Sequence, residues 1–180
     1  HDFSSYASAQ LQYVDTDKGL YEFFTKLLPV FQERNKKKHE LQARDCEQEE
    51  IYEAMCAYEP YFILIADLKA LVQLVNQSEY EMKGFFKNIL EKGSLHHIYF
   101  FSAVSLKDHQ EVFGDELYDV FTGYKTGVHL GGNMADNRIL SFESVPYMEQ
   151  TKVLPAGVGC LPDGATQAQT QKIVVPLARR

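Results

Sequence analysis

The sequence predicts an α/β domain in which a mainly parallel β-sheet is sandwiched by helices. Two continuous apolar runs, Tyr61–Ile65 and residues 98–101, have the length of strands and no polar–apolar alternation. Such runs are typical of parallel strands that are buried on both faces. Segments with helical spacing precede, separate and follow them, and this alternation characterises α/β folds. The 180 residues fit one domain, so we expect a single domain over residues 1–180.

The first predicted helix spans residues 18–43. Asp15, Thr16 and Asp17 form a good N-cap cluster, apolar residues follow at helical spacing, and Pro29 lies inside the helix. The later elements are predicted from apolar spacing and from Gly and Pro boundaries. Predicted helices cover 47–57, 68–76, 78–92 and 107–122; predicted strands cover 126–130, 138–142 and 172–176, with a strand-like end at 11–14 and turns at 131–133 and 157–159.

Composition and charge exclude several classes of protein. The net charge is -7, which disfavours nucleic-acid binding, because that binding depends on clustered Lys and Arg. The densest basic run, residues 34–38, is predicted to be a solvated helix face.

No apolar stretch approaches the ~20 residues that span a bilayer, so we expect no membrane insertion by this chain. The chain has three cysteines, Cys46, Cys56 and Cys160, and no two of them have CxxC spacing. The odd number and the spacing argue against disulfides and structural zinc and favour a reducing compartment.

The candidate site lies where the two apolar strands end, because ligands of open α/β sheets bind at the carboxyl ends of strands. The first strand is followed by Ala66 and Asp67, which resembles a Walker B segment. An active Walker B segment places one carboxylate on Mg²⁺ and another near the attacking water. Only Asp67 is acidic here, and the simpler interpretation is an N-cap for the next helix. The phosphate-binding motif G-x-x-x-x-G-K-[ST] is absent from the 180 residues.

Other chemistry-bearing residues give weaker signals. His96 and His97 are adjacent and lack metal-ligand spacing, and His129 lies in a strand pattern. We therefore predict no metal site and expect structural or surface roles for these histidines. No Gly-x-Ser-x-Gly motif is present, and a Cys–His dyad stays open although nothing points to one. Phe85, Phe86 and Tyr147 are either core residues, which is the simpler interpretation, or a docking surface.

Four stretches carry a resemblance to a known family: residues 61–68, 91–101, 124–133 and 154–159. The most specific of them is YKTGVHLGGN at 124–133. Together they resemble the FtsK/SpoIIIE ATPases, and more narrowly the C-terminal ATPase module of the EssC proteins of Gram-positive type VII secretion. The resemblance implies a RecA-like P-loop NTPase fold in a degenerate or N-terminally truncated form. It implies a fragment of a larger protein that begins after the P-loop and lies at the cytoplasmic face of the cell membrane.

The chain departs from the family at its chemical positions. The family's Walker B aspartate falls on Ala66, and the neighbouring acidic position falls on Asp67. The Thr-Gln pair that senses the γ-phosphate in active translocases falls on Ala103 and Val104. Loss of the metal-organising carboxylate should cost several kcal/mol of transition-state stabilisation. We therefore expect no hydrolysis by this chain and assign it no cofactor, whereas ATP and Mg²⁺ are the ligands that the resemblance implies for the parent protein.

Two functions from different classes follow from the resemblance. The first is a non-catalytic module that recognises WXG-type secreted proteins or takes part in assembly with other modules of its parent or with further copies. The alternative is an ATPase that is active only with its missing N-terminal part or neighbouring modules. In that case Asp67 is the surviving carboxylate, and Lys125 or Arg138 acts in trans. DNA translocation is the weakest alternative because of the acidic balance.

Overall fold

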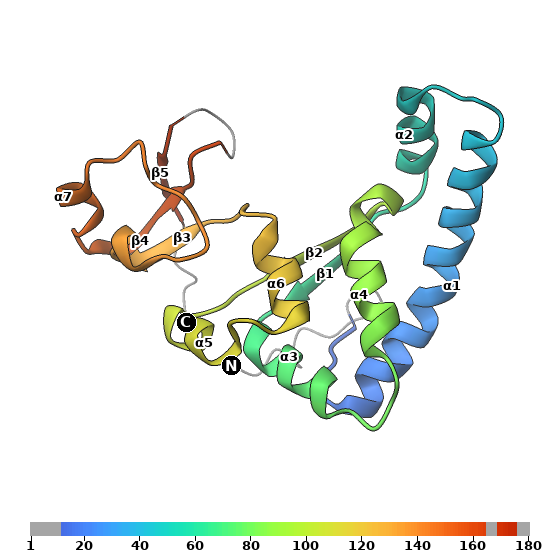
Figure 1. Cartoon of the computed structure of the whole chain (residues 1–180), viewed down its shortest axis with the longest axis horizontal. Helices are drawn as coiled ribbons and strands as arrows, with labels where there is room; N and C mark the ends of the chain where they lie inside the picture. Colours follow the sequence, from blue (N-terminus) through green and yellow to red (C-terminus); the bar gives the residue numbers. More distant parts are fainter. Residues whose placement is uncertain (1–11, 165–168, 176–180) are drawn as a thin grey trace. The chain divides into compact units, whose positions relative to one another are not determined.

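The computed structural model describes residues 12–164 and 169–175. The chain divides into two compact units, residues 1–104 (unit 1) and 105–180 (unit 2). The single domain expected over 1–180 therefore spans both units. Each unit combines helices with one small sheet, so the architecture is mixed α/β (Figure 1). None of the helices in the described part of the chain is long and apolar enough to cross a membrane.

The elements follow the chain in this order. Unit 1 contains α1 (Asp17–Gln42), α2 (Gln48–Cys56), β1 (Tyr61–Ile65), α3 (Leu68–Gln77), α4 (Lys83–Lys92), the 3-10 helix η2 (Gly93–His96) and β2 (Ile98–Ser102). Unit 2 contains α5 (Leu106–Val112), α6 (Glu116–Gly123), β3 (His129–Gly132), η3 (Met134–Asp136), α7 (Tyr147–Gln150), β4 (Leu154–Leu161) and β5 (Gln171–Val174).

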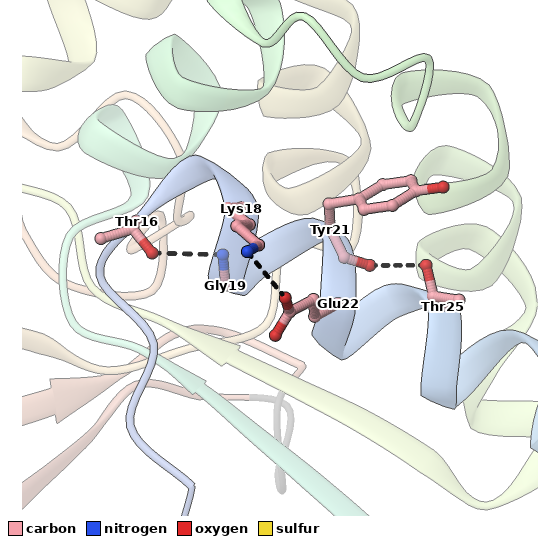
Figure 2. Close-up of polar contacts among 6 residues, drawn as sticks. All are labelled: Thr16, Lys18, Gly19, Tyr21, Glu22 and Thr25. Carbon is pink, nitrogen blue, oxygen red and sulfur yellow. Dashed lines mark hydrogen bonds and ion pairs between the residues drawn. The ribbon is translucent and has the colours of Figure 1, made fainter.

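Helix α1 begins where the N-cap cluster predicted. The Thr16 hydroxyl accepts a hydrogen bond from the Gly19 N–H at 3.1 Å, which satisfies one free donor of the first turn (Figure 2). A Cβ on residue 19 would lie 2.9 Å from that hydroxyl oxygen, so glycine leaves room for the cap. In the next turns Lys18 pairs with Glu22 at 3.7 Å, and the Thr25 hydroxyl donates to the Tyr21 carbonyl at 2.8 Å.

The core of unit 1 lies between α1, α4 and one face of the small sheet. Phe24 of α1 contacts Phe86 of α4, with ring centroids 4.5 Å apart, and Phe86 in turn contacts Phe100 of β2 at 6.0 Å. Phe24 and Phe86 are buried. Helix α2 packs beside the end of α1 (Figure 1). The buried stripe of α1 consists of Leu20, Phe24, Leu27, Phe31 and Arg34.

Strands β1 and β2 pair in parallel, with Phe62 opposite Tyr99 and Leu64 opposite Phe101. The prediction that β1 is buried on both faces is wrong. Phe62 is 62% exposed and Leu64 is 72% exposed, whereas Ile98 on the helix-covered face is buried. A continuous apolar run shows that both faces of a strand are suited to burial. It does not show whether the chain supplies a layer for each face.

The sheet of unit 2 is antiparallel, in the order β3-β4-β5. The expectation of a mainly parallel sheet is therefore wrong for the part of the chain that the structure describes. The connection from β4 to β5 is short, and short connections join antiparallel strands. Residues 157–159, predicted as a turn, lie inside β4. Gly159 packs closely there, because a Cβ would lie 2.8 Å from the Leu130 side chain and 3.0 Å from the His129 carbonyl oxygen.

Two predicted helices are shorter or divided. The helix expected over 78–92 begins only at Lys83, because Tyr80 stacks on Tyr21 with ring centroids 4.3 Å apart and its N–H donates to the Ser78 hydroxyl. The helix expected over 107–122 is divided into α5 and α6. Gly114 has a φ of 84°, and the Asp115 carboxylate accepts the N–H groups of the first turn of α6.

Four strand predictions also change. Residues 138–142 form no strand, because the Asn137 side chain accepts the N–H groups of Ile139 and Leu140 and fixes a turn. β3 continues through Gly131 and Gly132, where a turn was expected, and it starts at His129. Residues 12–14 form no strand, and Leu11 lies outside the described residues. The last strand is β5, which ends at Val174; residue 176 of its predicted range is also outside them.

Candidate functional site

The carboxyl ends of β1 and β2 meet at one edge of the parallel sheet. Ile65 lies opposite Ser102. The Ala103 N–H donates to the Ile65 carbonyl at 2.9 Å, and the Leu68 N–H donates to the Ala103 carbonyl at 2.9 Å. These bonds hold the two strand ends together and place Ala66, Asp67, Ala103 and Val104 along the same edge. The four sequence-predicted positions are therefore neighbours in space.

The Asp67 carboxylate is engaged by its own helix. Asp67 has an extended backbone, with φ at -140° and ψ at 100°, and is the N-cap of α3. One carboxylate oxygen accepts the Ala70 N–H at 2.9 Å. This bond satisfies one of the N–H groups that the first helical turn leaves without a partner. The N-cap interpretation of Asp67 agrees with this geometry.

The edge has few side chains that could ligate a metal ion or hydrogen-bond a phosphate. Ala66 and Ala103 present methyl groups and Val104 an isopropyl group, none of which ligates a cation or hydrogen-bonds a phosphate. Mg²⁺ needs an octahedral set of oxygen ligands, usually with one or two carboxylates and the phosphates of the nucleotide. Asp67 is the one carboxylate among the four positions, and it caps α3. The residues present therefore do not fit Mg²⁺–ATP as an active Walker B edge does.

Arg34 of α1 is a buried cation that the sequence reasoning placed wrongly on a solvated face. Its side chain donates to the carbonyl oxygens of His96 at 2.7 Å and Glu59 at 2.8 Å. The guanidinium also lies over the rings of Tyr58 and Tyr61, at 4.9 and 5.3 Å. It thereby ties α1 to the segments that enter β1 and β2. Spacing could have revealed it, because position 34 continues the apolar stripe of α1.

His96 is fully buried beside Arg34. Its ring meets the Phe31 ring edge-on with centroids 4.8 Å apart, and neither ring nitrogen has a hydrogen-bond partner in the described structure. Burial, together with the positive charges of Lys38 and Arg34, lowers the pKa of His96 to about 4. The neighbouring His97 is held by its Nδ1 against the Tyr58 carbonyl at 2.8 Å. Both residues thus serve the structure of unit 1.

A groove of about 270 Å³ in unit 2 brings together Lys125 and Arg138, the two residues considered for action in trans. Their juxtaposition was not predicted from the sequence. His109 and Asp119 also line this groove. The His109 Nδ1 lies 2.6 Å from the Tyr118 hydroxyl, and burial raises the pKa of Tyr118. The groove therefore combines two cations with one carboxylate.

His129 and Cys160 face each other across β3 and β4. Both are buried, which lowers the pKa of His129 and raises the pKa of Cys160. A thiol with a raised pKa stays protonated and is a poor nucleophile. The pair is therefore part of the core of unit 2, where Phe142 contacts the His129 ring. Cys46, Cys56 and Cys160 are all free.

Comparison with solved structures decides which fold this is. The chain matches the structure described as the cytoplasmic domain of EssC with a TM-score of 0.75 and 16% identity, over 97% of this chain and 31% of that one. It matches EssC (ATPases 2 and 3) from Geobacillus thermodenitrificans with a TM-score of 0.69 and 16% identity, over 96% of this chain and 29% of that one. The chain shares its fold with the EssC ATPase modules. It spans about a third of the length of these EssC chains. Protein-family models and curated proteins give no significant match.

The three aromatic residues considered for docking in this EssC-like module have different environments. Phe86 is fully buried, whereas Tyr147 is 69% exposed. Phe85 is half-buried and meets Phe24 edge-on, with ring centroids 5.9 Å apart. Phe86 is therefore a core residue, as the simpler interpretation held. Tyr147 lies in α7, next to exposed Met148 and close to exposed Val153.

Proposed function

We propose that the chain is a non-hydrolysing, EssC-like ATPase module that acts in substrate recognition or assembly during type VII secretion. The observation that carries the proposal is the engagement of Asp67 as the N-cap of α3, between Ala66 and the apolar pair Ala103 and Val104. A RecA-like core can keep its packing after its catalytic groups are lost, and its surfaces remain available for docking. We also propose that the fold of this module is RecA-like.

The partners proposed for this module are WXG-type secreted helical hairpins, other modules of a parent chain, and further copies of itself. We place it at the cytoplasmic face of a Gram-positive cell membrane, as part of a membrane protein. The segment with exposed Tyr147, Met148 and Val153 is the first surface in unit 2 to test for hairpin docking, because amphipathic helices dock through apolar side chains. Replacement of Tyr147 by Ser should weaken hairpin binding, which calorimetry measures.

An assay of phosphate release tests the absence of hydrolysis. The purified chain is incubated with ATP and Mg²⁺ beside its Asp67→Asn variant. The proposal expects release at the rate of the protein-free control for both proteins. Turnover by the wild-type chain that is lost in Asp67→Asn would overturn the proposal, since it would make the carboxylate catalytic. Asn is the matched replacement because it caps helices as well as Asp does.

The second candidate is an ATPase that works only with neighbouring modules. The groove that contains both Lys125 and Arg138 favours it, because neither side chain has an ion-pair partner among the residues described. An unpaired Arg can stabilise transition-state charge on a neighbouring active site. Addition of the chain to an active EssC-type module should then stimulate hydrolysis, and Arg138→Ala should remove the stimulation. No stimulation would favour the first proposal.

A further inference from the structure

The groove of unit 2 that contains Lys125 and Arg138 holds three charges that do not pair with one another. Asp119 of α6 lines the same groove, which has a volume of about 270 Å³. In the described part of the chain, no ion pair joins the Asp119 carboxylate to either cation. Every residue that lines the groove belongs to unit 2. One compact unit therefore offers two cations and one carboxylate to a ligand in a single concave site.

A buried tyrosine holds part of the groove lining in place. Tyr118 is fully buried, and its hydroxyl lies 2.6 Å from the Nδ1 of His109. The His109 ring meets the Phe113 ring edge-on, with centroids 5.5 Å apart. His109 and Phe113 both line the groove, as does Ile139. The lining thus combines a few polar groups with apolar side chains, which is the usual composition of a small-molecule site.

Lys125 occupies a backbone position that favours glycine. Helix α6 ends at Gly123, and the Lys125 N–H donates to the Thr122 carbonyl at 3.1 Å. With a φ of 49°, Lys125 has the left-handed conformation in which helix ends usually carry glycine. The other two non-glycine residues of the described chain with positive φ are Asp45 and His97, whose types are enriched in this conformation. Lysine is not, and such breaks of a local rule concentrate where a side chain serves function.

The three charges indicate which ligand neutralises them all. An arginine binds a carboxylate through two parallel hydrogen bonds, and a lysine presents a compact ammonium to a second carboxylate. The Asp119 carboxylate attracts an ammonium group and repels an anion. The matching molecule therefore has two carboxylates and one ammonium, whereas a polyphosphate leaves Asp119 opposed by like charge. The groove volume of about 270 Å³ lies just below the ~300–1,000 Å³ of typical ligand pockets, so the ligand is small.

We propose that this groove binds a free acidic amino acid, of the class of glutamate and aspartate, with its carboxylates on Lys125 and Arg138 and its ammonium on Asp119. The inference goes beyond the recognition function proposed above. It is also separate from the second candidate function, in which Arg138 acts on a neighbouring module. Amino-acid binding requires this chain alone, so either claim can fail without the other.

Titration of the whole chain, followed by NMR amide shifts, tests the site. L-glutamate and L-aspartate are compared with glutarate, which lacks the ammonium, and with 4-aminobutyrate, which lacks one carboxylate. At least one of the two amino acids should give saturable shifts around the groove. Glutarate and 4-aminobutyrate should each bind about 10-fold or more weakly, the effect of losing one charged hydrogen bond. Equal affinity for the amino acid and both analogues overturns the proposal.

Two variants connect the binding to named side chains. Lys125→Gly should weaken binding by about 10-fold or more without lowering the melting temperature, because glycine suits the left-handed position. Asp119→Asn should remove the preference for the amino acid over glutarate. Lys107→Gln is the matched control, because Lys107 is an exposed lysine of unit 2 outside the groove lining; it should bind as the wild-type chain does.

Three further results would overturn the proposal. The first is the absence of saturable shifts with both amino acids. The second is binding that Lys125→Gly and Asp119→Asn leave unchanged, which places the ligand elsewhere. The third is a Lys125→Gly variant that melts at a lower temperature than the wild-type chain, since the lysine would then serve the fold.

Discussion

The Asp67 carboxylate accepts the Ala70 N–H at 2.9 Å and begins helix α3. In an active P-loop ATPase, a carboxylate at this strand end holds Mg²⁺ or positions water. Here the neighbouring positions are alanine and valine, so the carboxylate is explained by helix capping alone. A capping role and a catalytic role make different predictions, because capping needs an oxygen acceptor and catalysis needs the charge.

Substitution of Asp67 separates the two roles through stability. Asp67→Ala removes the cap and should lower the free energy of unfolding by about 1 kcal/mol. Asp67→Asn keeps the acceptor and should change it by only a few tenths of a kcal/mol. Urea unfolding followed by circular dichroism measures both values. An Asn variant that is as unstable as the Ala variant would contradict the capping account.

Arg34 is expected to be one of the most sensitive positions of unit 1. Its guanidinium is buried and donates to the carbonyls of Glu59 and His96. A lysine cannot reproduce this forked geometry, so Arg34→Lys should lower the free energy of unfolding by roughly 2–4 kcal/mol. Chemical denaturation gives the value. Arg138→Lys is the matched control at an exposed site and should change the free energy of unfolding by no more than about 0.5 kcal/mol. Equal effects at both sites would refute the claim that Arg34 ties α1 to the segments that enter β1 and β2.

Buried His96 should make the chain sensitive to mild acid. Its folded-state pKa is about 4, below the ordinary value of 6.5, so the unfolded state binds more protons between these values. The free energy of unfolding should therefore fall as pH drops from about 6.5 to about 4 and should change no further through this group below 4. His96→Leu should remove the part of this pH dependence that comes from His96, on the order of 2 kcal/mol. The part that comes from His129, whose pKa burial also lowers, should remain. Thermal melts across this pH range provide the measurement; an unchanged slope in the variant would contradict the account.

Asp163 is expected to hold two loops of unit 2 together. Hydrogen bonds from Ser144 and then from Thr170 lower the pKa of Asp163 to about 2. The stabilisation is present above the unfolded value of 3.8 and is lost as pH falls through about 2. Asp163→Asn should therefore speed hydrogen exchange of the Ser144 amide, which donates to this carboxylate at 2.8 Å. Glu143→Gln changes an exposed neighbouring carboxylate and should leave that exchange rate unchanged. Unaltered exchange in Asp163→Asn would show that the carboxylate does not hold the loops.

Local signals in the sequence predicted unit 1 well. The N-cap at Thr16 and the apolar spacing after it located α1, and the apolar runs located β1 and β2 because short-range pattern determines such elements. Long-range contacts explain the failures. The stacking of Tyr80 on Tyr21 shortens a predicted helix, and the close packing of Gly159 against Leu130 places a Gly-rich segment in a strand.

The same distinction applies to the site. Ala66, Asp67, Ala103 and Val104 lie along one edge because parallel strands end together, and the sequence was sufficient to expect this. The groove shared by Lys125 and Arg138 was not foreseeable, since it depends on how the segments after α6 and η3 fold back. The exposure of Phe62 was also beyond sequence reasoning, because an apolar strand has the same pattern whether or not a second layer covers it.

Calorimetric titration of the chain with ATP in the presence of Mg²⁺ tests the central claim most directly. The claim is that the edge formed by Ala66, Asp67, Ala103 and Val104 no longer handles a nucleotide. We expect no heat of binding beyond dilution, for the wild-type chain and for Asp67→Asn alike. Saturable binding by the wild-type chain that requires Mg²⁺ and is lost in Asp67→Asn would contradict the claim, because it would show that the carboxylate still organises a metal–nucleotide complex.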